Sequence, residues 1–472
     1  MGSREVIDLQ GTHVTVAGLG VSGIPAAKVL HARGAHVTVV NDGDDARARE
    51  QAAELEALGV TVRLGDGATL PEGTELVVTA PGWKPDKPLF TAARAAGVEI
   101  WGDVELAWRL RGPDAAPWLA ITGTNGKTTT TQMLASILKA AGLRTAAVGN
   151  IGVSVLDAVL GDEQYDVLAV ELSSYQLHWA PSLRAHSAAV LNLAPDHLDW
   201  HGSMEAYAAD KGRVYEGNRV ACVYNVADKA TEDLVREADV EEGCRAVGFT
   251  LGTPGPSQLG VVEGILVDRA FVEDRHRNAQ ELAEVSDVNP PAPHNIANAL
   301  AAAALARAFG VPARAVRDGL RDFTPDAHRI AHVADVGGVA YVDDSKATNT
   351  HAAEASLAAY ESIVWIAGGL AKGATFDELV AKSAKRLRGA VLIGQDRALI
   401  REALARHAPE VPVVDLDRTD TGAMLAAVQE ASRLAVAGDT VLLAPACASM
   451  DMFANYNKRG DAFAEAVREL GS

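Results

Sequence analysis

Residues 121–130, ITGTNGKTTT, decide the fold prediction. They follow the apolar run PWLA and precede a segment whose apolar residues recur at helical spacing. This apolar face comprises Met133, Leu134, Ile137, Leu138 and Ala141. A strand, a glycine-rich loop and a helix in this order are typical of a phosphate-binding loop, where backbone N–H groups and the helix N-terminus surround phosphate. In such a loop Lys127 reaches the β- and γ-phosphates and Thr128 binds Mg²⁺.

The loop departs from the strict pattern G-x-x-x-x-G-K-[ST], because Ile121 occupies the first glycine position. A glycine-rich turn that binds nothing is therefore the alternative interpretation. The order of strand, loop, lysine, threonine and helix favours the phosphate-binding interpretation.

Outward from this loop, short runs rich in Val and Ile alternate with Ala-rich helical segments along the whole chain. This alternation predicts an α/β fold with parallel sheets. The 472 residues correspond to about three domains at roughly 100–200 residues each. A linker at 112–117 and a break at 323–326 set the expected domains at 1–113, 114–325 and 326–472. We expect a Rossmann-like first domain, an ATPase-like central domain and a Rossmann-like third domain.

Composition excludes several classes of protein. The chain carries 62 acidic and 43 basic residues, a net charge of −19, which repels nucleic acid. Its apolar runs are far shorter than the roughly 18 residues of a membrane-spanning helix. The charged N-terminal residues do not fit a signal peptide, and three dispersed cysteines do not fit a disulfide framework. We therefore expect a cytoplasmic protein that neither binds nucleic acid nor inserts into a membrane.

Candidate metal ligands follow two apolar strands. Glu171 ends the run DVLAVE, at the edge of a parallel sheet where ligand-binding groups collect. The segment 195–216 then brings together polar groups at a spacing that matches no zinc motif. These groups are Asp196, His197, Asp199, His201 and Lys211. A solvated polar loop is the alternative interpretation for each of them alone.

A second glycine-rich loop lies near the N-terminus. Gly18, Gly20 and Gly23 form G-x-G-x-x-G after an apolar strand, a pattern typical of dinucleotide binding. Asn41 and Asp42 only approximately match the acid expected about 20 residues later. A nicotinamide-dependent oxidoreductase is thus an alternative function.

Several motifs in order resemble the Mur ligase family, the ATP-dependent amide-forming enzymes of peptidoglycan precursor synthesis. These motifs are TGTNGKT at 122–128, HN-x-x-N at 294–298, HRI at 328–330 and DDSKATN at 343–349. The segments VAGLGVSG at 16–23 and APACASMDMFANYNKRGDAF at 444–463 resemble most the branch that adds D-glutamate to UDP-N-acetylmuramoyl-L-alanine. The resemblance implies ATP, two Mg²⁺ ions, these two small-molecule substrates and an acyl phosphate intermediate. We expect a monomer.

The resemblance also implies site residues. The ATP site comprises Thr122, Gly123, Thr124, Asn125, Gly126, Lys127, Thr128, Thr129, Asn295, Asn298, Arg329, Asp344 and Lys346. The metal ligands are Thr128, Glu171, His197 and Lys211, with Lys211 carbamylated, and the catalytic residues are Lys127, His197 and Lys211. The UDP-substrate contacts are Val21, Ser22, Asn41, Asp42, Gly82 and Asn150. The D-glutamate contacts are Thr348, Lys372, Ser449 and Tyr456.

Three alternatives to this function stay open. A sister ligase, including a folylpolyglutamate synthase, would use another donor or acceptor. The oxidoreductase would bind nicotinamide at the Gly18 loop, and a non-catalytic scaffold would bind ATP without turnover.

Overall fold

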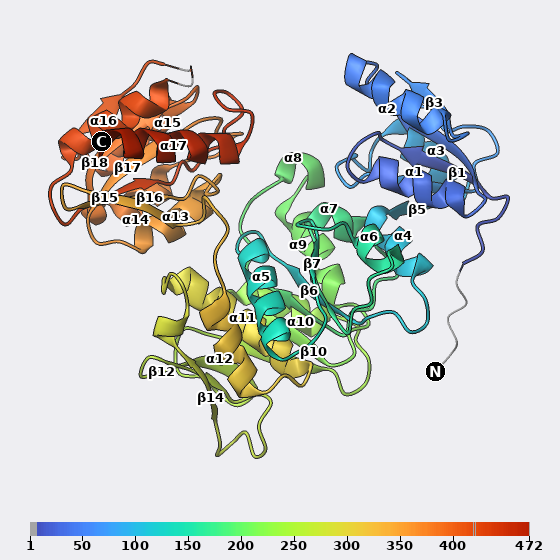
Figure 1. Ribbon diagram of the computed structural model, residues 1–472, viewed down its shortest axis with the longest axis horizontal. Helices are drawn as coiled ribbons and strands as arrows, with labels where there is room; N and C mark the ends of the chain where they lie inside the picture. Colours follow the sequence, from blue (N-terminus) through green and yellow to red (C-terminus); the bar gives the residue numbers. More distant parts are fainter. Residues whose placement is uncertain (1–6, 419, 421, 472) are drawn as a thin grey trace. The chain divides into compact units, whose positions relative to one another are not determined.

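A computed structural model describes residues 7–418, 420 and 422–471. The chain forms two compact units (Figure 1). The first contains residues up to 288 together with 296–323, and the second contains 289–295 together with the residues from 324 onward. Within the described residues, two sheets lie in the first unit and one in the second.

The N-terminal sheet is parallel, with strand order β3-β2-β1-β4-β5. Its strands are β1 (His13–Ala17), β2 (His36–Asn41), β3 (Thr61–Leu64), β4 (Leu76–Thr79) and β5 (Glu99–Gly102). Its helices are α1 (Gly23–Ala32), α2 (Ala46–Glu56), α3 (Pro88–Ala95) and α4 (Asp103–Leu110). The turn from β1 to α1 requires glycine at position 23, because a Cβ atom there would lie 1.9 Å from the Gly18 carbonyl oxygen.

The central sheet has the strand order β14-β13-β12-β11-β10-β9-β6-β8-β7. Pairing is parallel from β7 to β12 and antiparallel between β12, β13 and β14. The strands are β6 (Trp118–Thr122), β7 (Ala147–Gly149), β8 (Leu168–Glu171), β9 (Ser187–Val190), β10 (Ala221–Asn225), β11 (Arg245–Phe249), β12 (Gln258–Val262), β13 (Ile265–Asp268) and β14 (Gln280–Glu284). Strands β12 and β13 pair antiparallel around the turn at Glu263 and Gly264, so the segment VVEGILVD at 261–268 forms a hairpin.

Helices join these strands. They are α5 (Lys127–Ala140), α6 (Val155–Leu160), α7 (Ser174–His178), α8 (Leu198–His201), α9 (Met204–Gly212), α10 (Lys229–Glu237), α11 (Pro293–Ala308) and α12 (Ala313–Asp322), with 3₁₀ turns at Arg213–Tyr215 and Val285–Asp287. The apolar face of α5 is buried at Met133, Leu134, Ile137 and Leu138, as its periodicity predicts. Burial of that face holds the N-terminus of α5 at the edge where β6, β8 and β9 end.

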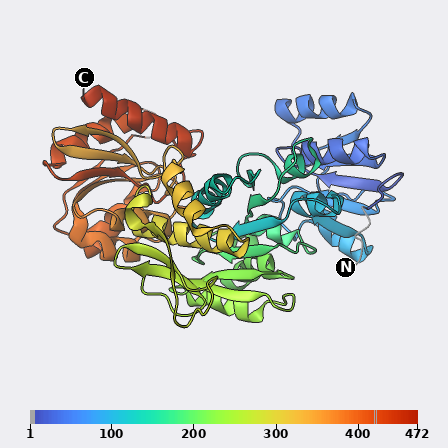
Figure 2. The ribbon, with the colours of Figure 1, turned by 60° about the horizontal axis from the view of Figure 1, so that its bottom comes forward.

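The sheet of the second unit has the order β15-β16-β20-β17-β18-β19, and only the β15–β16 pair is antiparallel. Its strands are β15 (Ala331–Val336), β16 (Val339–Asp343), β17 (Ile363–Gly368), β18 (Leu387–Ile393), β19 (Val413–Asp415) and β20 (Thr440–Leu443). Its helices are α13 (Thr350–Ala358), α14 (Asp377–Ser383), α15 (Arg397–His407), α16 (Ala423–Leu434) and α17 (Tyr456–Leu470), with a 3₁₀ turn at Ala384–Arg386. Figure 2 shows the red C-terminal helix α17 beside the strands of this sheet, and it packs on β15 and β16.

These three parallel or mostly parallel sheets confirm the predicted α/β class. Among the described residues, no helix is long and apolar enough to cross a membrane. Strand β7 was not expected, because AVG offers too few residues to show a β pattern.

Candidate active site

The glycine-rich loop joins β6 to α5, as the sequence predicts. Gly126 has φ 83°, and a Cβ atom there would lie 2.4 Å from Oδ1 of Asn298. Glycine is therefore required both by the left-handed backbone and by the close approach of α11. The Lys127 ammonium donates to the carbonyl oxygens of Gly123 and Thr124, each at 2.9 Å, so its side chain folds back over the loop.

Lys211 reaches the same loop from α9. Its side chain is buried, and its ammonium donates to the Gly123 carbonyl at 2.8 Å and to the Thr122 hydroxyl at 3.4 Å. Burial, followed by repulsion from Lys127, lowers the pKa of Lys211 well below its ordinary value. The loop is thus approached by two lysines, one of which is biased toward the neutral, nucleophilic amine.

Glu171 is the last residue of β8 and is 1% exposed. Its Oε1 accepts a hydrogen bond from the Asn150 side chain at 3.1 Å, whereas its buried Oε2 has no hydrogen-bond partner in the described structure. An unsatisfied buried carboxylate oxygen is costly unless a ligand completes it. Glu171 acts electrostatically on Lys211, as does Asp196, so these groups share one site.

His197 immediately precedes α8 and adopts the left-handed backbone, with φ 54°. Its ring lies 4.9 Å from the Tyr175 ring. Burial lowers the pKa of His197; Asp196 opposes this shift, and Lys127 and Lys211 reinforce it. The structure therefore brings together Lys127, Glu171, His197 and Lys211, which lie far apart in the sequence.

Sequence reasoning missed Asn192, which fastens the glycine-rich loop from outside. Its Oδ1 accepts from the Asn125 backbone N–H at 2.9 Å, and its side-chain nitrogen donates to the Asn125 carbonyl at 3.1 Å. Its own carbonyl accepts from the Thr124 N–H at 3.0 Å. The Thr124 hydroxyl also contacts the Tyr207 hydroxyl at 3.0 Å and donates to the Ala194 carbonyl at 3.1 Å.

A second missed group centres on Asp210, the neighbour of Lys211. Asp210 contacts the Nδ1 atoms of His178 and His201 at 2.9 and 3.0 Å and pairs with Arg213 at 3.2 Å. Burial alone would raise the pKa of Asp210, but the hydrogen bonds to both histidines outweigh it and bring that pKa to about 2. This ionised carboxylate fixes α7, α8 and α9 to one another beside Lys211.

Five of the six expected UDP-substrate residues lie at the N-terminal sheet; Asn150 follows β7 of the central sheet, where its side chain donates to Glu171. Val21 is 87% exposed on the second glycine-rich loop, between β1 and α1, and the Ser22 hydroxyl donates to Asp103 at 3.0 Å. Asn41 supports this loop through its Oδ1, which accepts from the Leu19 N–H at 3.1 Å. Asp42 pairs with Lys87 at 2.5 Å. Asn41 therefore has an evident structural role here.

Gly82, which follows β4, touches the central domain. The Trp200 indole N–H donates to the Gly82 carbonyl at 3.2 Å, and the nearby Lys84 ammonium donates to the Asp199 carbonyl at 2.7 Å. The loop after β4 and helix α8 are thus in direct contact within the first unit.

The expected acceptor residues all lie in the second unit, where β16, β17 and β20 end. Arg459 of α17 is 1% exposed and ties their segments together. It donates to the Ser345 carbonyl at 2.8 Å and to the Cys447 carbonyl at 3.0 Å. Backbone bonds between Leu370 and Ala448 join the segments that carry Lys372 and Ser449.

The expected nucleotide residues of this unit lie on neighbouring segments. Asp344 is buried, accepts from the Ile330 N–H at 3.3 Å and from the Ser356 hydroxyl, and has its pKa raised to about 6 by burial. The Lys346 ammonium lies 4.1 Å from the centre of the Tyr456 ring. Cys447 is buried, and burial raises the pKa of its thiol to about 12, which suits a small hydrophobic residue rather than a nucleophile.

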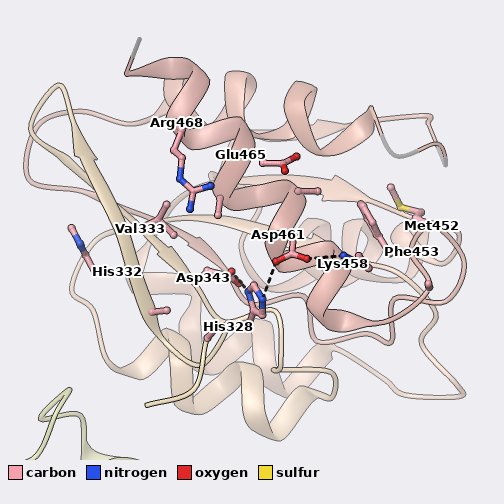
Figure 3. A pocket seen from close by; sticks show the side chains of 15 residues that line it. His328, His332, Val333, Asp343, Met452, Phe453, Lys458, Asp461, Glu465 and Arg468 are labelled. Atoms are coloured by element: carbon pink, nitrogen blue, oxygen red, sulfur yellow. Dashed lines mark hydrogen bonds and ion pairs between the residues drawn. The ribbon is translucent and has the colours of Figure 1, made fainter. Parts of the chain in front are cut away.

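A cavity of about 750 Å³ lies between β15 and α17 (Figure 3). At its floor, Nδ1 of His328 contacts Asp343 at 2.6 Å and Nε2 lies 3.4 Å from Asp461. The hydrogen bond to Asp343 raises the pKa of His328 despite partial burial. His328 directly precedes Arg329 in the chain. Lys458, Glu465 and Arg468 give its walls mixed charge.

The described residues contain no cluster of three His, Cys, Asp or Glu side chains suited to a metal.

Three family models match the chain. They are the Mur ligase MurD-like N-terminal domain at residues 12–102, the Mur ligase middle domain at 121–306 and the Mur ligase glutamate ligase domain at 328–447. The first of them covers the Gly18 loop, which therefore gives no support to an oxidoreductase. The expected domain boundaries at 113 and 325 stay predictions.

Two curated relatives span nearly the whole chain, and both are named UDP-N-acetylmuramoylalanine--D-glutamate ligase. The protein of Streptomyces avermitilis is 89% identical over 98% of this chain and 99% of its own. The protein of Thermobifida fusca is 60% identical over 98% of this chain and 100% of its own.

Solved structures share the fold at low identity. The UDP-N-acetylmuramate-alanine ligase of Thermotoga maritima has a TM-score of 0.55 and 19% identity over 97% of this chain and 99% of that one. A pseudomurein peptide ligase of Methanothermus fervidus has a TM-score of 0.57 and 17% identity over 98% of this chain and 100% of that one. From the phosphate-binding loop, the family models across all three sheets and these relatives, we conclude that the chain belongs to the Mur ligase family.

Proposed function

We propose that the chain is an ATP-dependent ligase that joins D-glutamate to the L-alanyl carboxylate of UDP-N-acetylmuramoyl-L-alanine. The observation that carries this proposal is the meeting of Lys127, Glu171, His197 and Lys211 around one glycine-rich loop. The names of relatives at 89% and 88% identity support the choice of donor and acceptor. The expectation of a cytoplasmic monomer stays a prediction.

Amide formation from a carboxylate in water is uphill, so the carboxylate must first be activated. Its oxygen attacks the γ-phosphorus, ADP leaves and an acyl phosphate forms; the D-glutamate nitrogen then attacks the carbonyl carbon and phosphate leaves. Two anions meet in the first step. The Lys127 ammonium would neutralise part of that charge, together with the loop N–H groups and the N-terminus of α5.

The proposed ATP site extends the loop residues 122–129 by Asn298, which lies against Gly126. Asn295, Arg329, Asp344 and Lys346 complete the proposed contacts by the family resemblance. The buried Asp344 carboxylate suits a hydroxyl pair such as a ribose, because each hydroxyl would donate a hydrogen bond to it.

The residues fit a Mg²⁺ site, since Glu171 offers a buried oxygen that accepts no hydrogen bond from any described residue. Thr128 and Glu171 would hold one Mg²⁺ ion, and His197 and carbamylated Lys211 would hold a second; when bound, the ions would neutralise phosphate charge. The depressed pKa of Lys211 supports its carbamylation: the neutral amine nitrogen attacks CO₂, and loss of one proton leaves a carbamate anion. That anion would replace a cation by an oxygen ligand beside Gly123.

A base must accept the proton of the incoming ammonium. Burial lowers the pKa of His197, which favours its neutral imidazole for this role when the ring nitrogen holds no metal; a phosphate oxygen is the alternative acceptor. Thr348, Lys372, Ser449 and Tyr456 are proposed to hold D-glutamate, since its two carboxylates need cations and hydroxyl or N–H donors. Val21, Ser22, Asn41, Asp42, Gly82 and Asn150 are proposed to hold the UDP substrate.

Phosphate release tests the proposal. The purified protein receives Mg²⁺ and ATP with or without UDP-N-acetylmuramoyl-L-alanine, and with D-glutamate, L-glutamate, meso-diaminopimelate, L-lysine or no amino acid. We expect release only with the nucleotide substrate and D-glutamate. Release with another acceptor would move the assignment to a sister ligase, and silence in a folded preparation would refute it.

Variants on one helix sharpen the test. Lys127→Ala should abolish release, whereas Lys139→Ala removes an exposed lysine from the same helix α5 and should keep it. Equal activity in the two variants would remove Lys127 from the mechanism.

A further inference from the structure

Residues 191–201, which we name the bridging segment, connect two parts of the first unit. At its start, Asn192 and Ala194 bind the glycine-rich loop of the proposed ATP site through Thr124 and Asn125. At its end, two hydrogen bonds join it to the loop after β4 of the N-terminal sheet. The Asp199 carbonyl accepts one from Lys84, and the Trp200 indole donates the other to Gly82. His197 lies between these two attachments.

The local backbone of His197 depends on the far attachment. Its left-handed φ of 54° is unfavourable for a side chain with a Cβ atom, so surrounding contacts must impose it. The His197 carbonyl accepts from the Trp200 N–H at 3.0 Å and from the His201 N–H at 3.1 Å. Trp200 therefore binds His197 through its backbone N–H, and it binds the N-terminal domain through its indole N–H.

The Trp200 side chain is well placed to act as a rigid link. It is 9% exposed, and its ring lies 4.8 Å from the Tyr175 ring and 4.5 Å from the His201 ring. Tyr175 in turn lies 4.9 Å from the His197 ring. A movement of Gly82 would thus reach the His197 imidazole through closely packed rings.

We propose that Trp200 is a positioning residue that couples the donor-nucleotide site at Gly82 to His197 and the phosphate-binding loop. The inference rests on the proposed function, because Gly82 is a proposed contact of the UDP substrate. Binding of the donor orders the Gly82 carbonyl, which accepts the hydrogen bond of the Trp200 indole. The ordered Trp200 in turn stabilises the left-handed backbone of His197. Donor and ATP therefore bind with positive cooperativity, and this cooperativity passes through the bridging segment.

Trp200→Phe tests the coupling, because it keeps an aromatic ring and removes the indole N–H. The chain offers a matched control in Trp179→Phe: the Trp179 indole is also buried, at 4% exposed, but its N–H has no hydrogen-bond partner in the described structure. Titration calorimetry measures donor affinity with and without saturating Mg²⁺ and a non-hydrolysable ATP analogue. The ratio of the two affinities is the coupling factor.

We expect the wild type and Trp179→Phe to share a coupling factor well above one. In Trp200→Phe, loss of one hydrogen bond should lower the affinity for the donor by roughly fivefold when the ATP analogue is bound. The coupling factor should then be close to one. The affinity for the ATP analogue without donor should stay within twofold of wild type. A general loss of stability would lower both affinities, so it would not produce this difference. An unchanged coupling factor in Trp200→Phe, or a wild-type factor of one, overturns the inference.

Lys84→Met provides a second test should Trp200→Phe fold poorly, because it removes only the ammonium that holds the Asp199 carbonyl. Lys84→Met should also lower the coupling factor. A coupling factor equal to that of the wild type would count against a role of the bridging segment. The proposed function has its own readout. If the wild type does not release phosphate with donor and D-glutamate, the function fails; if it does while the coupling stays intact in both variants, only the inference fails.

Discussion

Asn192→Ala is expected to loosen the phosphate-binding loop from outside the site. The change removes both side-chain hydrogen bonds to the Asn125 backbone, at 2.9 and 3.1 Å, and keeps the backbone bond to Thr124. A neutral hydrogen bond contributes about 1 kcal/mol, so the two together contribute about 2 kcal/mol. If that energy orders the loop for ATP, its loss corresponds to a roughly 30-fold rise in the KM for ATP.

Steady-state phosphate release at saturating donor and D-glutamate measures this KM, and urea unfolding measures the stability. Asn278→Ala is the matched control, because the exposed Asn278 makes one side-chain hydrogen bond, to the Glu273 carbonyl, far along the chain from the loop. Asn192→Asp should fall between wild type and Asn192→Ala, since it keeps the acceptor for the Asn125 N–H and loses the donor. A KM for ATP within twofold of wild type in Asn192→Ala would refute the reasoning.

Three further outcomes follow from the site. Glu171→Ala should cut turnover by orders of magnitude while circular dichroism stays native, because it removes the buried oxygen that no protein group satisfies; near-normal turnover would exclude Glu171 from the mechanism. Depleting dissolved CO₂ should lower wild-type turnover and bicarbonate should restore it, since the buried Lys211 amine is proposed to form a carbamate; an activity indifferent to CO₂ would contradict this. The contribution of Asp344 to stability should fall as the pH rises from 3.8 to about 6, because its carboxyl binds the proton more tightly in the folded state. The loss amounts to about 3 kcal/mol at most, and urea unfolding of Asp344→Asn should show a flatter pH profile than wild type.

The sequence predicted those parts of the site that are contiguous. The glycine-rich loop and the first turn of α5 lie within ten residues, and glycine, lysine and threonine in that order have few other uses. Many parallel strands, such as β2 and β17, also follow from their Val- and Ile-rich runs, because burial on both faces of a parallel sheet demands them, whereas β7 and β14 have no such run.

Contacts between distant segments could not be predicted in this way. Asn192 lies 67 residues from Asn125, Trp200 lies 118 from Gly82, and Arg459 lies 114 from Ser345. A single polar or aromatic residue in a loop has no periodicity, so its partner emerges only when the sheet order is known. The depressed pKa of Lys211 is likewise a consequence of tertiary burial.

The buried Arg459 has a consequence for exchanging parts between ligases of this family. Its guanidinium donates to Ser345 and to the Cys447 carbonyl, and it belongs to α17, the last helix of the chain that the structure describes. A graft of one loop carrying Lys372 or Ser449 into another enzyme would lose the hydrogen bonds that Arg459 makes to Ser345 and Cys447. A graft of the whole block from 324 onward would carry them intact. If Lys372 and Ser449 bind the acceptor as proposed, we expect acceptor preference to transfer only with the whole block, and the C-terminal helix belongs to the part that must be transferred.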